Sequence, residues 1–229
     1  MFYDYSFWRT LANPSHLTHL LSMEYEEGAK IRGYKKALLF IFLFTVLLFG
    51  LRNILGVGTE SLTELLVASS DDRYIVARLF SLAGALIMAL VFWAFHYYVV
   101  AYAISALTEL PFKWVQKVQL YVIFFIVLEK VLTFIVFVIA GFNTPFTFFS
   151  LAPMTAYIYY NEFLLFFLNQ LTVATLVTIF IQYKFLRPWI ESNHKTLLLK
   201  LILIQFTIAL AIAALSVFPI IHWIERGLS

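Results

Sequence analysis

The composition of this 229-residue chain excludes an ordinary soluble domain, because 62% of its residues are hydrophobic and only 13% are charged, against roughly a quarter charged in soluble proteins. The formal net charge of +3 by itself says little about function. In a membrane protein, the side of the membrane on which the lysines and arginines lie is more informative. The absence of cysteine excludes disulfides, thiol catalysis and thiolate metal sites. We therefore expect an all-α fold, a polytopic membrane helix bundle in the lipid bilayer, with no cofactor and no nucleic-acid partner.

Residues 1–35 form the first predicted unit, a cytoplasmic or interfacial amphipathic segment. Asn13 followed by Pro14 predicts a helix start, because asparagine caps helices well and proline at the first helical position needs no amide hydrogen. One face of this helix is apolar and is formed by Leu17, Leu20 and Leu21. Two positions suit such a helix: it lies in the membrane interface, or it packs under the bundle as a soluble cap.

Residues 36–224 form the predicted membrane domain, which contains five stretches that are long and apolar enough to cross a bilayer, for which roughly 20 residues suffice. The second stretch exceeds the required length, so it must tilt or project from the bilayer. The five predicted spans cover residues 36–56, 74–107, 118–141, 163–185 and 197–223.

Two connections between the spans carry local signals. Ser61 and Glu64 have the spacing of a capping box, which predicts a short surface helix over residues 61–68. Residues 142–162 contain two prolines, many aromatic residues and neither lysine nor arginine. We expect this second connection to be an interfacial or re-entrant segment that serves as a lid over the bundle or as a docking surface for another membrane protein.

Small residues recur every four positions in the second span, which predicts a face where another helix approaches closely. These residues are Ala77, Ser81, Ala85 and Ala89. His96 lies almost two helical turns beyond Ala89, so we expect it to point into the bundle as well.

The distribution of basic residues predicts an N-terminus inside and a C-terminus outside. Excess positive charge marks the cytoplasmic face, and five spans place the two ends of the chain on opposite sides. With the N-terminus inside, eleven lysines and arginines lie in cytoplasmic segments and four in outer segments. The expected location is the bacterial cytoplasmic membrane, with a Golgi or endoplasmic-reticulum membrane as the alternative.

Two adjacent charges, Glu129 and Lys130, lie at the centre of the third span. A charge at that depth costs roughly 2.5 to 3.5 kcal/mol on insertion scales, so neighbouring helices must supply partners. Helix geometry rotates the two side chains about 100° apart, and we therefore expect each to find a separate partner.

Other polar residues in the spans complete a predicted intramembrane polar network. Its members are His96, Glu129, Lys130, Thr133, Asn169, Thr172 and Thr175. The last three continue with Thr178 and Gln182 as a polar row along one side of the fourth span. Because lipid is a poor environment for such a row, we expect it to face the bundle interior.

Three functions are compatible with this interior. In the first, Glu129, His96 and the row from Asn169 form a hydrogen-bonded lock that fixes helix order, and the outer surface binds a partner. In the second, the polar residues line a path for a proton or small solute, with Glu129 as the titrating group. In the third, a membrane enzyme uses Glu129 and His96. A transporter requires a water-accessible cavity at Glu129, an enzyme requires a polar cleft at a membrane face, and a scaffold requires close packing.

Metal-binding and catalytic motifs are sparse. His16 and His19 are three residues apart on one predicted helix face, a spacing at which imidazoles can converge on a metal ion, but no third ligand accompanies them. The chain contains no HExxH frame, no phosphate-binding glycine loop and no GxSxG motif. We therefore predict no metal, cofactor or catalytic site, and no enzymatic activity.

The arrangement of these segments resembles the Yip1 family of small integral membrane proteins, especially its bacterial branch. The resemblance covers residues 10–220 and rests on the Asn13–Pro14 helix start, on the five spans, and on a short connection before the third span that contains Pro111, Lys113 and Trp114. It implies a non-enzymatic protein that associates with other membrane proteins; eukaryotic members are tied to Rab GTPases and vesicle traffic. We accordingly expect an accessory subunit, assembly factor or organiser whose partner is another membrane protein or a second copy of itself.

Overall fold

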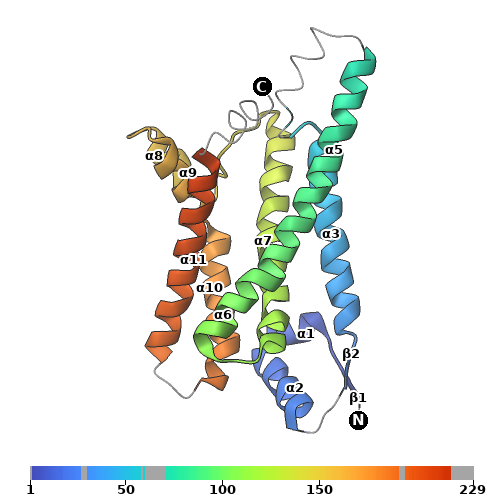
Figure 1. The fold of residues 1–229 in the computed structure, drawn as a ribbon, viewed down its shortest axis with the longest axis vertical. Coiled ribbons are helices and arrows are strands. Elements are labelled where there is room, and N and C mark those ends of the chain that lie inside the picture. The colour runs from blue at the N-terminus through green and yellow to red at the C-terminus, as the bar shows by residue number, and fades with distance from the viewer. Residues whose placement is uncertain (1, 27–29, 58, 60–70, 191–193, 218–229) are drawn as a thin grey trace, which may run out of the picture.

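The computed structural model describes residues 2–26, 30–57, 59, 71–190 and 194–217, and these form a bundle of long helices with a small segment packed at one end (Figure 1). The bundle consists of α3 (Tyr34–Ile54), α5 (Asp71–Ala94), the π-helix η1 (Phe95–Val100), α6 (Ala101–Thr108), α7 (Phe112–Ala140), α8 (Ala152–Ala156), α9 (Glu162–Gln170), α10 (Val173–Leu186), the 3₁₀ turn η2 (Arg187–Trp189) and α11 (His194–Val217). Helical structure therefore dominates, as the composition predicts.

Within the described residues, four helical segments are long and apolar enough to cross a membrane, as judged by length and composition. They are Tyr34–Ile54, Asp72–Thr108, Phe112–Ala140 and His194–Val217. These segments coincide with the first, second, third and fifth predicted spans, and they indicate a membrane protein. The predicted surface helix over residues 61–68 and the part of the fifth span beyond Val217 lie outside the described residues.

The fourth predicted span, residues 163–185, is not one continuous helix, which corrects the expectation from the sequence. The structure divides it into α9 and α10, which meet at Leu171 and Thr172. Thr172 has an extended backbone (φ −105°, ψ 175°), and its side chain caps α10 instead of continuing the row on a single helix. A threonine hydroxyl that bonds the local backbone competes with the helical ladder and suits a helix start.

Helix α7 (Phe112–Ala140) starts before the third predicted span, residues 118–141, and ends beside its last residue. Hydropathy sets the start of that span at residue 118, beyond Lys113 and Lys117, whereas α7 begins directly after Pro111. Proline favours such a start because it cannot continue a preceding helix. The helix ends at Gly141, whose positive φ of 69° is the left-handed conformation common after helix C-termini.

The N-terminal residues form a compact segment beneath the bundle. Strand β1 (Phe2–Asp4) pairs in parallel with β2 (Lys30–Arg32), and between them lie α1 (Phe7–Ala12) and α2 (Pro14–Glu26). In Figure 1 this segment lies at the same end of the bundle as the α6–α7 turn and the α10–α11 junction. Helix α2 begins at Pro14, as the Asn13–Pro14 pair predicts.

The core of the bundle is arranged around α7, which packs against α10, α6, η1 and α3. One apolar cluster joins the N-terminal segment to α6, α7, α10 and α11, and a second joins α3, α5 and η1 to α7. In the small-residue row of α5, Ala89 is fully buried and the Ser81 hydroxyl accepts a hydrogen bond of 2.7 Å from the Asn53 amide of α3. By contrast, Leu79 and Phe80 of the same helix are exposed, as is usual for side chains that face lipid.

Candidate functional site

Polar side chains cap the break between α9 and α10. Thr172 and Thr175 form a reciprocal cap: the Thr172 hydroxyl accepts from the Thr175 amide at 3.4 Å, and the Thr175 hydroxyl accepts from the Thr172 amide at 3.3 Å. The Thr175 hydroxyl also donates to the Gln170 carbonyl at 2.6 Å, across the break. Both threonines of the predicted network therefore satisfy backbone groups that the break leaves free.

Glu129 of α7 completes the start of α10. Its Oε2 accepts a hydrogen bond of 2.7 Å from the backbone amide of Ala174, the second residue of that helix. A carboxylate at this position satisfies a free amide and also lies at the positive end of the helix dipole. The partner of Glu129 is thus backbone, which the residue pattern alone did not predict.

A second set of hydrogen bonds ties the loop after α7 to the two helices beside it. The Thr133 hydroxyl of α7 lies 3.1 Å from the Thr147 hydroxyl. Asn169 of α9 accepts from the Thr147 amide at 2.9 Å and donates to the Pro145 carbonyl at 3.3 Å. Ser150 adds a hydrogen bond to Asn169 at 3.2 Å. The structure therefore brings Thr133 and Asn169 together through the loop rather than through direct contact.

Lys130 and His96 lie apart from this arrangement. The Lys130 Nζ is 5.5 Å from the centre of the Phe92 ring on α5, a cation–π distance. His96 is half-buried, and its Nδ1 donates to the Phe92 carbonyl of its own helix at 2.9 Å. The seven predicted network residues thus occur in two groups, one on the α10 side of α7 and one on the α5 side.

The part of the polar row toward the C-terminal end of α10 is buried and has few hydrogen-bond partners. Thr178 and Gln182 of α10 are buried, and within the described part of the chain the Thr178 hydroxyl and the Gln182 Nε2 have no hydrogen-bond partner. Gln182 accepts from Gln205 of α11 at 3.5 Å. Gln119 of α7, which the sequence analysis did not select, is fully buried with neither end of its amide paired in the same described part. The sequence feature that could have identified Gln119 is a polar amide side chain within a run of apolar residues.

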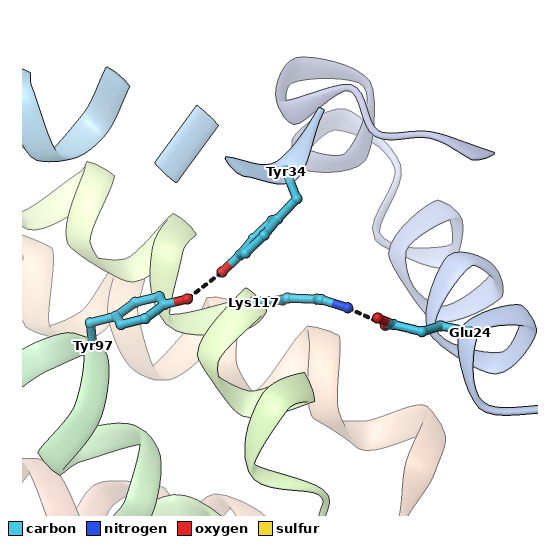
Figure 2. Close-up of polar contacts among 4 residues, drawn as sticks. All are labelled: Glu24, Tyr34, Tyr97 and Lys117. Atoms are coloured by element: carbon cyan, nitrogen blue, oxygen red, sulfur yellow. Dashed lines mark hydrogen bonds and ion pairs between the residues drawn. The ribbon is translucent and has the colours of Figure 1, made fainter. Parts of the chain in front are cut away.

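The contacts that hold the N-terminal segment form a further polar site (Figure 2). The Tyr34 hydroxyl at the start of α3 lies 2.8 Å from the Tyr97 hydroxyl of η1. Glu24 of α2 forms an ion pair with Lys117 of α7, whose side chain is only 8% exposed. The Lys117 ammonium also lies 5.8 Å from the centre of the Tyr34 ring. The ion pair connects the N-terminal segment to α7, and the tyrosine pair connects the start of α3 to η1.

Helix α2 packs against the end of the bundle, and Leu20 and Leu21 are buried within its core cluster. Both predicted positions of the N-terminal segment, in the membrane interface and as a cap under the bundle, allow this packing. Tyr5 is also buried, and its hydroxyl lies 2.5 Å from that of Tyr121 on α7. Burial, together with the neighbouring Tyr121, raises the pKa of Tyr5 above its ordinary value.

The two histidines considered as metal ligands lie on α2. His16 Nδ1 is 3.1 Å from the Thr10 hydroxyl of α1, and burial, with lesser contributions from Arg9 and His19, lowers the pKa of His16. Among the described residues, no group of three histidine, cysteine or acidic side chains is placed to hold a metal ion.

Glu129 lines neither of two hollows on the surface of the described residues. The first is shallow and lies along α5 at Asp72, Arg73 and Phe80. The second, of about 610 Å³, lies at the α10–α11 junction between Lys184 and His194.

The segment after α7 presents several strongly exposed apolar side chains. Tyr157 is 94% exposed and Ile158 is 88% exposed, while Met154 is 71% exposed and Tyr160 is 70% exposed. This segment, with α8, projects beside the end of α9 (Figure 1). An apolar group that extends so far from the bundle requires lipid or protein to cover it.

Comparison of the chain with protein-family models, with curated proteins and with solved structures found no match.

Proposed function

We propose that this chain is an integral membrane interaction protein of the Yip1 type, an accessory subunit, assembly factor or organiser in a bacterial cytoplasmic membrane. In this proposal it crosses the membrane five times, with α9 and α10 together as a broken fourth crossing. A broken helix is tolerated in a bilayer where its free backbone groups find other partners. The bonds from Glu129, Thr172 and Thr175 to the backbone at the break supply such partners.

The proposed orientation places the N-terminal segment in the cytoplasm and the loop after α7 outside. The N-terminal segment, the α6–α7 turn and the α10–α11 junction lie at one end of the bundle (Figure 1). These three regions carry most of the lysines and arginines of the chain, as cytoplasmic regions of membrane proteins do.

The proposed function rests on the exposed apolar group of Met154, Tyr157, Ile158 and Tyr160. Aromatic residues are enriched where membrane proteins meet one another and where they meet the lipid headgroups. We infer that these four side chains, which we call the outer apolar group, contact another membrane protein or a second copy of this chain. The interior is consistent with this function, because the Glu129 carboxylate is bonded to the α10 backbone and so has a structural role.

Movement of a proton or small solute is the second candidate function. The buried Gln119 amide and the buried Gln182 Nε2, which have no hydrogen-bond partner among the described residues, favour it, since such groups bind water readily when water can reach them. The Glu129 carboxylate is already bonded to the backbone amide of Ala174, which makes this candidate the weaker one.

Site-specific photo-crosslinking in native membranes tests the interaction function. A photoreactive phenylalanine analogue replaces Tyr157 in the outer apolar group or, as a matched control, Phe80 of α5, which is 75% exposed. We expect one protein adduct of defined mass from position 157 and only lipid adducts from position 80. Lipid adducts alone from both positions contradict a docking role for the outer apolar group.

A further inference from the structure

We propose that the hollow at the α10–α11 junction binds the phosphate headgroup of an anionic phospholipid. The hollow has a volume of about 610 Å³, within the range of small-molecule sites. Its walls include Phe180, Tyr183, Lys184, Arg187, Ile190 and His194. The inference rests on the membrane arrangement proposed above, and it is independent of any protein partner.

The charge of the hollow favours an anion. Lys184 and Arg187 are both exposed and lie one helical turn apart at the end of α10. The Lys184 ammonium is 5.6 Å from the Phe180 ring centre and the Arg187 guanidinium is 5.9 Å from that of Tyr183. None of the described residues that line the hollow is acidic. The aromatic rings therefore hold two cations in place without neutralising them.

A further polar group lies at the same hollow. The Nδ1 atom of His194 is buried and has no hydrogen-bond partner within the described ranges. His194 is also the first residue of α11, a helix of 24 residues, and the first amides of a helix attract anions. The imidazole of His194 therefore adds a polar group to the wall of the hollow.

The apolar side of the hollow favours a lipid over a free phosphate ion. Phe180 is 61% exposed, and it continues an exposed apolar line along α10 through Leu176 and Val173. Residues three and four apart share one face of a helix, so this line offers an acyl chain a continuous path away from the cations. Basic sites between membrane helices on the cytoplasmic side commonly bind anionic lipid headgroups.

The test measures the thermal stability of the purified chain in detergent during titration with short-chain lipids. The three additives are dioctanoyl phosphatidylglycerol, the zwitterionic dioctanoyl phosphatidylcholine, and inorganic phosphate. A ligand that binds only the folded state raises the unfolding temperature with its concentration, which yields an apparent Kd. We expect a saturable rise with phosphatidylglycerol alone.

Two double variants locate the binding site. Lys184→Gln with Arg187→Gln should weaken the apparent Kd for phosphatidylglycerol roughly 25-fold, about fivefold for each cation removed. Lys35→Gln with Lys36→Gln removes the same charge from exposed residues at the start of α3 and should leave the Kd within about twofold of the parent. If the first double variant does not fold, Arg187→Gln alone should weaken binding about fivefold, and Arg187→Lys should restore it.

Three results would overturn the proposal. They are an equal rise with phosphatidylcholine, an equal rise with inorganic phosphate, and equal weakening by the two double variants. The second result identifies a free phosphate as the ligand, and the third identifies general surface charge. Each leaves the photo-crosslinking result at Tyr157 unaffected, so the failure of the lipid site and the failure of the interaction function are distinguishable.

Discussion

The carboxylate of Glu129 on α7 accepts a hydrogen bond of 2.7 Å from the backbone amide of Ala174 at the start of α10. This contact joins the middle of α7 to the break between α9 and α10. It gives a membrane-buried acid a role in structure, because the acid stabilises a helix end that has too few partners of its own.

The first prediction concerns the loss of this cap. Glu129→Gln retains an oxygen that can accept from Ala174, whereas Glu129→Leu leaves the amide unpaired. We expect thermal unfolding in detergent to show a loss of about 0.5 to 1 kcal/mol for the Gln variant and about 2 to 3 kcal/mol for the Leu variant.

A matched control for this experiment is Glu162→Leu. Glu162 lies in the first turn of α9 and is exposed, so its replacement should cost less than about 1 kcal/mol. If Glu129→Leu is as stable as the parent protein, the carboxylate does not support the start of α10.

The second prediction concerns the ion pair between Glu24 and Lys117, which holds the N-terminal segment to α7. Glu24→Ala leaves a buried ammonium without its carboxylate, so we expect a loss of about 1 to 3 kcal/mol, reduced from the full buried-pair value because Glu24 is partly exposed. Trypsin should then cleave sooner at Lys30 and Arg32. Lys113→Ala, an exposed residue of the same helix, should leave the cleavage rate unchanged. Unchanged cleavage in Glu24→Ala contradicts a role for the pair in docking.

The third prediction is a pH dependence at His16. The folded protein lowers the pKa of His16 below its reference value of 6.5, so folding favours the neutral imidazole. The stability from this group is complete above about pH 6.5 and is lost as the pH falls through the lowered pKa. We expect unfolding temperatures measured between pH 7.5 and about 5 to fall less steeply in His16→Gln than in the parent. Parallel curves would show that another group controls the pH dependence.

The fourth prediction concerns orientation in the membrane. The chain contains no cysteine, so single cysteines report their own positions. Tyr157→Cys should react with a membrane-impermeant thiol reagent in intact cells, because Tyr157 is exposed on the proposed outer side. Lys113→Cys, at an exposed position before the third crossing, should react only after the membrane is opened. The reverse pattern would invert the proposed topology.

Hydropathy predicted four of the long helices because apolar length is a property of each segment alone. The start of α2 at Pro14 was also predictable, since Asn13 and Pro14 act locally. The break at Thr172 was not predictable in this way. Neither glycine nor proline marks it, and its stability depends on Glu129, which lies 45 residues away in sequence.

The same distinction applies to the candidate site. Polar residues inside apolar segments identified Glu129, Thr172 and Thr175 as members of one network, but a residue pattern carries no information on which backbone amide a carboxylate meets. The pair of Glu24 and Lys117 was missed for a related reason. The two residues are 93 positions apart, and each is an ordinary charged residue until α2 packs beneath α7.

We propose that Glu129 is a structural cap in an interaction protein and does not carry protons. Proton flux into liposomes that contain the purified chain and a pH-sensitive dye separates this role from proton transport, with empty liposomes as the reference. We predict that the parent protein and Glu129→Gln both give the flux of empty liposomes. A flux in the parent protein that Glu129→Gln abolishes, while the variant remains folded, would contradict the claim and establish the transport function in its place.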